Sequence, residues 1–306
     1  MNYQRSFSLL TALLLGQLFF PCIAFSSGLL IIYPSVKAPY NKIYKDIIKG
    51  IETNYGGLTN KLKIAPKNAD HMLAEKIEKY QPDVLITLGR QSLKEVGGLN
   101  LSTPLVAGAI TKTDQAVSGV SMTPDPEIIL SHLLMIAPFV SRVYVVADTD
   151  RYAQIERANA YLKQQDKILK TEKATSIQQA ADKYLKIINS ASASDAIWLM
   201  RGASLNDPSI LMLVLEAAWK KKIVVFSSNP AHVKRGALFS VYPDNEKMGA
   251  ALARVAQQLN RPDYQATPNL GLSPLRNLHL IVNKRTSKHL GINPNNISGL
   301  NIHRLL

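Results

Sequence analysis

The chain has 306 residues, of which 46% are hydrophobic and 19% are charged. This composition excludes an intrinsically disordered protein, and the length allows one large or two ordinary α/β domains. The net charge of +14 comes from basic residues spread over many segments, and aromatic residues make up only 7% of the chain, which argues against a nucleic-acid partner and for a solvated basic surface.

The N-terminal segment is typical of a signal peptide. Arg5 supplies a short basic region, and the apolar stretch from Leu9 to Phe20 is too short to span a bilayer comfortably. We expect residues 1–26 to be the signal, with cleavage between Ala24 and Ser27, and a periplasmic mature protein; an uncleaved membrane anchor is the alternative. Cys22 is the only cysteine, so the mature chain is expected to contain no disulfide, thiol nucleophile or cysteine metal site.

Strand and helix patterns alternate from Gly28 onward. In the first half, apolar runs predict strands and apolar stripes at helical spacing predict the helices between them. The predicted strands are 28–33, 62–65, 84–88, 104–110 and 117–122, and the predicted helices are 41–55, 72–80, one that starts at 91, and 127–138.

The same alternation continues in the second half. Predicted strands are 142–147, 167–173, 196–200, 223–226, 237–242 and 278–282, and predicted helices are 151–165, 177–188, 208–222, 244–259 and a short one that ends near 291. The strand 167–173 has more charge than the others and is expected at a sheet edge. The segment 261–275 contains three of the 16 prolines and is expected to be extended.

Two successive β/α series predict an α/β fold of two doubly wound, Rossmann-like lobes joined by a hinge. We expect residues 28–119 and 244–277 in the first lobe, and residues 120–243 and 278–306 in the second. In open α/β sheets, ligands bind at the carboxyl ends of the strands, so a ligand is expected in the cleft between the lobes.

The sequence lacks the motifs of common enzymes. It has no GxxxxGK[ST] loop, no GxGxxG after the first strand, no HExxH and no GxSxG, and its six histidines are dispersed. We therefore predict no catalytic residues, no metal and no cofactor. An enzyme, a hydrolase or transferase, is one alternative for the function. It would need a positioned nucleophile or base that the sequence does not reveal.

One buried strand leads directly into a polar segment. Ile223 to Phe226 is an uninterrupted apolar run, and Ser227, Ser228 and Asn229 follow it. Their hydroxyl and amide groups suit a small polar ligand at a strand end. Asn229 can equally cap the helix that begins at Pro230, because capping uses the same residue types.

Several segments in order resemble the ABC transporter substrate-binding proteins that include tryptophan-binding and other amino-acid-binding members, which have the type I periplasmic binding protein fold. The segments are Pro82–Gly89, Thr103–Ile110, Val117–Ser121, Val224–Asn229 with Val233–Leu238, and Leu280–Thr286 with Leu290 and Gly291. The resemblance implies a two-lobed clamp that is not an enzyme. It also implies a small polar solute as ligand, an inner-membrane permease and ATPase as partners, and a monomeric state.

The resemblance and the strand ends together nominate a ligand site. A carboxylate is expected at the helix that follows Gly89, because backbone N–H groups at a helix N-terminus bind anions. The candidate ligand-binding residues are Tyr33, Ser35, Gly89, Arg90, Gln91, Ser92, Ala109, Thr111, Asp148, Arg201, Ser228, Asn229 and Tyr242, with Asp244 near the hinge.

The chain departs from the family pattern where an ammonium group would bind. Thr111 to Asp114 reads Thr-Lys-Thr-Asp where the family often has Thr-Asp-Pro, Arg201 follows a strand where an acidic or amide residue is common, and Asn229 replaces a common Asp. These changes favour a more anionic or neutral solute, because a buried unpaired ammonium is costly. They also motivate the main alternative, an exported ligand-sensing or interaction protein with a divergent site that partners a membrane sensor.

Overall fold

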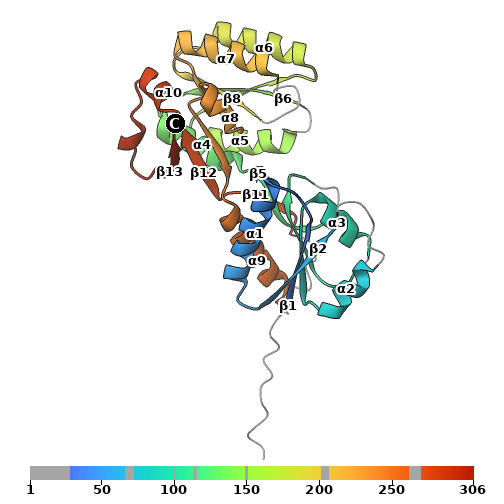
Figure 1. Cartoon of the computed structure of the whole chain (residues 1–306). Helices are drawn as coiled ribbons and strands as arrows, with labels where there is room; N and C mark the ends of the chain where they lie inside the picture. The colour runs from blue at the N-terminus through green and yellow to red at the C-terminus, as the bar shows by residue number, and fades with distance from the viewer. Residues whose placement is uncertain are drawn as a thin grey trace, which may run out of the picture.

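The computed structural model describes residues 28–65, 72–99, 101–112, 116–148, 151–200, 207–261 and 270–306. Two separate β-sheets, each covered by helices, form two lobes that are joined by crossing segments (Figure 1). The predicted α/β class with two lobes is thereby confirmed. Among the described residues, no helix is long and apolar enough to cross a membrane.

The first sheet has six strands, and all its paired strands are parallel. Its spatial order is β11 (Leu272–Leu275), β5 (Ser118–Pro124), β4 (Leu105–Ile110), β3 (Val84–Leu88), β1 (Gly28–Pro34) and β2 (Leu58–Ile64). β3 is buried at every position, as expected for a central parallel strand with helices on both faces.

Helices cover both faces of this sheet. Alternate side chains of β1 divide between two cores: Leu29 and Ile31 pack with α1 (Tyr40–Tyr55) and α9 (Asn245–Leu259), whereas Leu30 and Ile32 pack with α2 (Leu73–Tyr80) and α3 (Arg90–Gly97). The period of two along a strand is the reason for this division.

The second sheet has seven strands, and it is parallel except for the pair β10–β12. Its order is β13 (Ile302–Leu305), β12 (Leu278–Val282), β10 (Phe239–Pro243), β9 (Val224–Ser227), β8 (Asp195–Leu199), β6 (Arg142–Ala147) and β7 (Ile168–Lys173). The charged strand β7 lies at the edge, as its sequence predicted.

The remaining helices belong to the second lobe. Figure 1 shows α6 (Ile177–Ser190) and α7 (Pro208–Lys221) on one side of its sheet, and α4 (Pro126–Ile136) and α5 (Tyr152–Gln164) on the other. The shorter helical segments are α8 (Ala231–Arg235), α10 (Lys284–His289) and the 3₁₀ turn η4 (Pro294–Asn296). One large cluster of buried apolar side chains joins these layers.

In the described ranges the chain passes between the sheets at three places: after β5, after β10, and between β11 and β12. All of β5 belongs to the first sheet, so the first crossing lies after Pro124 rather than at residue 120. The C-terminal part of the segment expected to be extended forms β11, which pairs with β5. Strand β13, which the sequence did not suggest, pairs with β12 and forms one edge of the second sheet.

Candidate functional site

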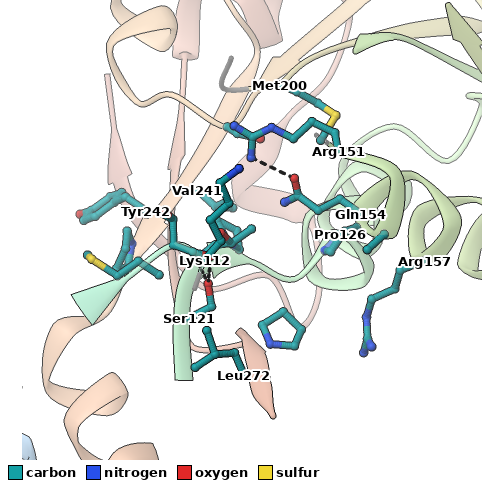
Figure 2. Close-up of a pocket in the computed structure, with 18 of the residues that line it drawn as sticks. Lys112, Ser121, Pro126, Arg151, Gln154, Arg157, Met200, Val241, Tyr242 and Leu272 are labelled. Atoms are coloured by element: carbon teal, nitrogen blue, oxygen red, sulfur yellow. Dashed lines mark hydrogen bonds between the residues drawn. The ribbon is translucent and has the colours of Figure 1, made fainter. Parts of the chain in front are cut away.

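A cavity of about 990 Å³ lies between the two lobes. Its walls are the carboxyl ends of β4, β6, β8 and β9, and residues of β5, β10 and β11 line it where the chain crosses between the sheets. The cavity therefore combines strand ends from both lobes with the hinge segments (Figure 2). This is the position where open α/β sheets bind ligands.

Four of the residues nominated from the sequence line this cavity: Thr111, Asp148, Ser228 and Tyr242. Thr111 is contributed by the first lobe, Asp148 and Ser228 by the second, and Tyr242 by the hinge end of β10. Asp244, beside that hinge, caps α9 through its carboxylate, which accepts a hydrogen bond from the backbone N–H of Lys247 at 3.1 Å.

Eight other nominated residues do not line the cavity, and their role in ligand binding stays a prediction. They are Tyr33, Ser35, Gly89, Arg90, Gln91, Ser92, Ala109 and Asn229. Arg201 lies outside the described residues.

At the start of α3, the nominated Gln91 side chain makes structural contacts. The Gln91 side-chain amide donates to the carbonyl of Ala65 at 2.7 Å and to Glu95 at 2.9 Å. Ser92 is fully buried. Gly89 has φ +87°, a backbone conformation that residues with a side chain rarely adopt, so the backbone favours glycine here.

The polar residues at the end of β9 and directly after it divide into structural and cavity-facing ones. The buried Ser227 hydroxyl donates to the carbonyl of Leu199 at 3.1 Å, and its oxygen lies 2.9 Å from Nδ1 of His232. Since that hydroxyl proton is already used, His232 donates from Nδ1, and its Nε2 accepts from the Asn229 amide at 3.2 Å. Asn229 also accepts from the backbone N–H of Ala231 at 3.1 Å, which is the capping interpretation of this residue.

Ser228 is the member of this segment that reaches the cavity. Its hydroxyl oxygen accepts a hydrogen bond from the indole N–H of Trp198 at 3.1 Å. Trp198 is buried and its ring is stacked with that of Phe226 at a centroid distance of 6.0 Å. A rigid aromatic side chain therefore holds the Ser228 hydroxyl at the cavity wall.

The structure adds polar residues that the sequence did not nominate as ligand-binding, chiefly Arg151, Gln154 and Lys112. Arg151 Nη1 donates to Gln154 Oε1 at 3.1 Å (Figure 2). Arg151 Nε lies 3.8 Å from Asp148 Oδ1. Arg151 directly precedes α5, and a position between a strand end and a helix start was the one available signal. Nothing in the sequence indicated that Lys112 lines the same cavity as Arg151.

Apolar side chains complete the cavity. Met200, Val241 and Leu272 line it together with the Tyr242 ring. That ring also lies beside His279 and His303, whose own rings are stacked at a centroid distance of 3.9 Å. Burial raises the pKa of Tyr242, so this side chain offers a neutral phenol over the physiological range. Over the described ranges, no group of three or more His, Cys, Asp or Glu residues is placed to hold a metal ion.

A family model described as ABC transporter substrate binding protein matches residues 47–299. No curated protein matches the chain. The structure is similar to a ligand-free, open substrate binding protein with adhesive properties from Clostridium difficile, with TM-score 0.63 and 16% identity over 91% of this chain and 98% of the other.

It is also similar to an ABC domain from Streptococcus pneumonia in complex with L-Trp, with TM-score 0.52 and 17% identity over 92% of this chain and 100% of that one. A conserved domain protein from Vibrio cholerae gives TM-score 0.51 and 17% identity, with coverage of 92% and 100%. At these identities the structural likeness establishes the type I periplasmic binding protein fold and not the ligand.

Proposed function

Because the chain belongs to the ABC transporter substrate-binding protein family, we propose that it is the solute-binding component of an ABC transporter. It binds a small polar solute between its lobes and presents the solute to an inner-membrane permease and ATPase. One observation carries this proposal: the cavity of about 990 Å³ takes its walls from both lobes and borders the hinge segments. Its volume is that of a small-molecule site.

The arrangement of the walls supports binding by lobe closure. Thr111 and Lys112 belong to the first lobe, whereas Arg151 and Ser228 belong to the second. A solute that contacts both sets favours the conformation in which the lobes approach each other, because only that conformation makes all the contacts. The proposed lobes are residues 28–124 with 244–275, and residues 125–243 with 278–306.

The proposed setting is the periplasm. Residues 1–26 have the sequence pattern of a signal peptide, and a binding component must meet its solute outside the inner membrane. We propose that the protein acts as a monomer and releases its solute chemically unchanged.

A thermal-shift screen of the refolded mature protein tests the binding function. Refolding removes any co-purified solute, and the panel contains amino acids, aromatic acids, nucleosides, dicarboxylates and sugars. A solute at 100 times its Kd is expected to add about 2.7 kcal/mol to the free energy of unfolding. A protein that melts cooperatively but responds to none of these compounds contradicts the proposal.

Transport needs a separate test. Uptake of the radiolabelled hit by cells that lack this protein is expected to fall, and expression of the chain is expected to restore it. Unchanged uptake, with binding intact, favours the second candidate function, an exported ligand-sensing protein that contacts a membrane sensor. The departure from the family pattern at Lys112 favours that candidate, because it changes the cavity lining without removing the cavity.

A further inference from the structure

We propose that one end of the second lobe binds an anionic phospholipid surface. The residues that bind it are exposed cations at the end of α7 and directly after it, on α8 and on α10. This set, the basic cluster, consists of Lys220, Lys221, Lys222, Lys234, Arg235, Lys284, Arg285 and Lys288. The inference goes beyond the proposed solute-binding function and does not depend on which solute the cavity takes.

The three helices that carry the basic cluster contact one another. The carbonyl oxygen of Trp219, in the last turn of α7, lies 2.9 Å from Nε2 of His289 in α10, and the two rings are stacked at 3.7 Å. The Thr286 hydroxyl of α10 donates to the carbonyl of Gly236, directly after α8, at 3.0 Å. The fold therefore gathers on one surface cations that are far apart in the sequence.

This surface lies at the opposite end of the sheet from the cavity. The cavity is built at the carboxyl ends of strands that include β6, β8 and β9. Lys222 and Gly236 instead precede β9 and β10, which are parallel to each other. Helix α10 follows β12, which is antiparallel to β10 and ends with Val282 opposite Phe239. The basic cluster therefore lies at the amino ends of β9 and β10, where a bound solute leaves it accessible.

Charge of one sign dominates these elements. Glu216, which pairs with Lys220 at 3.1 Å, is the one acidic residue of α7, α8 and α10. With eight cations against one acid, these helices and Lys222 carry half of the net charge of +14. The stretches 217–243 and 277–306 contain no Asp or Glu. A surface with such a field attracts an anionic partner.

Other acidic groups at this end of the sheet do little to offset the charge. Asp195, at the amino end of β8, is fully buried and is paired with Arg142 at 2.8 Å. The carboxyl group of Leu306, whose oxygen accepts from the backbone N–H of Lys284 at 2.8 Å, offsets one charge. The cluster stays strongly positive after both are counted.

Most members of the basic cluster are available to an outside anion. Five of them are exposed and, within the described ranges, have no side-chain hydrogen bond or ion pair: Lys222, Lys234, Arg235, Lys284 and Lys288. An exposed cation without an acidic partner exerts its full charge on an approaching surface. Each Lys or Arg near an anionic membrane strengthens binding about fivefold.

The residue types favour a lipid surface over an acidic protein. Six of the eight cations are Lys, which is depleted in protein–protein interfaces, whereas aromatic residues and Met are enriched there. Among the described residues, no exposed large hydrophobic side chain lies on α8, on α10 or in the last turn of α7. The cluster thus lacks the anchors of a protein interface and has the charges that phospholipid headgroups attract.

Sedimentation with vesicles tests the inference on the refolded mature protein. One set of vesicles contains phosphatidylglycerol and phosphatidylcholine in equal parts, and the other contains phosphatidylcholine alone. At about 0.1 M salt we expect binding to the anionic vesicles and none to the neutral ones. At about 1 M salt we expect the binding to be lost, because the screening length falls from about 10 Å to about 3 Å.

A fourfold variant assigns the binding to the basic cluster. It is expected to weaken binding to the anionic vesicles by about 50-fold or more, and it combines Lys222→Gln, Lys234→Gln, Lys284→Gln and Lys288→Gln. Replacement of the same four residues by Arg keeps the charge and is expected to keep the binding. Melting temperatures verify that the variants are folded.

A matched control removes the same charge from the first lobe. It is expected to weaken vesicle binding by less than about fivefold, and it combines Lys45→Gln, Lys63→Gln, Lys79→Gln and Lys94→Gln, all at exposed positions. Equal losses in the two fourfold variants would mean that net charge and not this surface is responsible, and would overturn the inference.

The remaining outcomes also decide the matter. Absence of binding to the anionic vesicles, or equal binding to the neutral ones, overturns the inference. Tighter binding to soluble polyglutamate than to the vesicles assigns an acidic protein as partner and overturns the lipid assignment. The cluster variant is expected to keep its full response in the solute screen, so failure of membrane binding leaves the solute-binding proposal standing.

Discussion

Arg157 of α5 donates two hydrogen bonds to the fully buried carboxylate of Asp125, from Nε at 2.9 Å and from Nη2 at 3.1 Å. Asp125 stands at the first crossing between the lobes, where it also caps α4 through the backbone N–H of Glu127. Arg276, at the crossing between β11 and β12, donates to the same carboxylate. One acid group thus ties two hinge segments to a helix of the second lobe.

This relationship predicts the effect of Asp125→Asn. The substitution removes the shared negative charge and leaves two arginines with weaker acceptors. Both arginines are about half exposed, so solvent screening reduces the cost below that of a fully buried pair, and we expect a loss of about 2 kcal/mol in the free energy of unfolding. Urea denaturation measures it. Asp46→Asn, which breaks the exposed pair with Lys42, is the control and should cost under about 0.5 kcal/mol; equal losses would contradict the network.

A second prediction concerns Ser228. Replacement by Ala removes the hydroxyl that accepts from Trp198 and faces the cavity. We expect the affinity for the solute to fall about fivefold to tenfold and the free energy of unfolding to fall by about 1 kcal/mol. Ser190→Ala, on α6 and outside the cavity lining, should leave the affinity unchanged. Weakened stability with intact affinity would assign Ser228 a packing role alone.

The two tryptophans of the chain provide an optical measurement of the same site. Trp198 contacts the cavity residue Ser228, whereas Trp219 of α7 is stacked on His289 at 3.7 Å. In a Trp219→Phe variant, the emission of Trp198 is expected to change when solute binds, because the indole N–H environment changes. In a Trp198→Phe variant, the remaining Trp219 emission is expected to stay constant.

Stability is expected to fall as the pH drops below about 6.5, the ordinary pKa of histidine. Burial lowers the pKa of His132 and of His279. For His279, the carboxylate of Asp244 partly opposes burial, while the interactions with His303 and Lys247 act in the same direction as burial. The folded state therefore binds fewer protons than the unfolded state, so stability is full above the unfolded pKa and declines as the pH falls through the lower folded values.

Melting temperatures between about pH 8 and pH 5 measure this slope. The double variant His132→Gln and His279→Gln is expected to flatten it. The carboxyls of Asp195 and Asp244 lose their contribution only at more acidic pH, because hydrogen bonds outweigh burial and lower their pKa values. A slope unchanged by the double variant would show that other groups cause it.

The contact between α1 and α9 predicts the effect of two glycine substitutions. A Cβ at Gly50 would lie 1.9 Å from the Glu246 carbonyl oxygen, and one at Gly249 would lie 2.1 Å from that of Ile47. Each Gly→Ala change must separate two helices of the first lobe, and we expect it to cost about 3 kcal/mol. Gly98→Ala is the matched control, since its Cβ would meet atoms at an ordinary 3.6 Å. Chemical denaturation of the three variants measures the free energy of unfolding. A cost at Gly50 and Gly249 no larger than that at Gly98 would contradict the close helix contact.

The local pattern of the sequence determined most of the secondary structure. The apolar runs at β3, β8 and β9 are buried at every position, and alternation with helical stripes indicated two doubly wound lobes. Helix starts were also predictable: the Ser176 hydroxyl accepts from the backbone N–H of Gln179 at 3.2 Å, and Asp207 caps α7. Such signals need only neighbours in the chain, because strand and helix periodicities are local.

The tertiary structure alone decided which strand ends meet. The order of the sheets brings Lys112, after β4, to the same cavity as Arg151, after β6, and neither periodicity nor spacing encodes that convergence. It also placed all of β5 in the first sheet and paired the Ser227 hydroxyl with the carbonyl of Leu199, which belongs to the neighbouring strand β8. Side-chain partners separated widely along the chain depend on sheet order and crossing geometry, which the sequence pattern of each element does not contain.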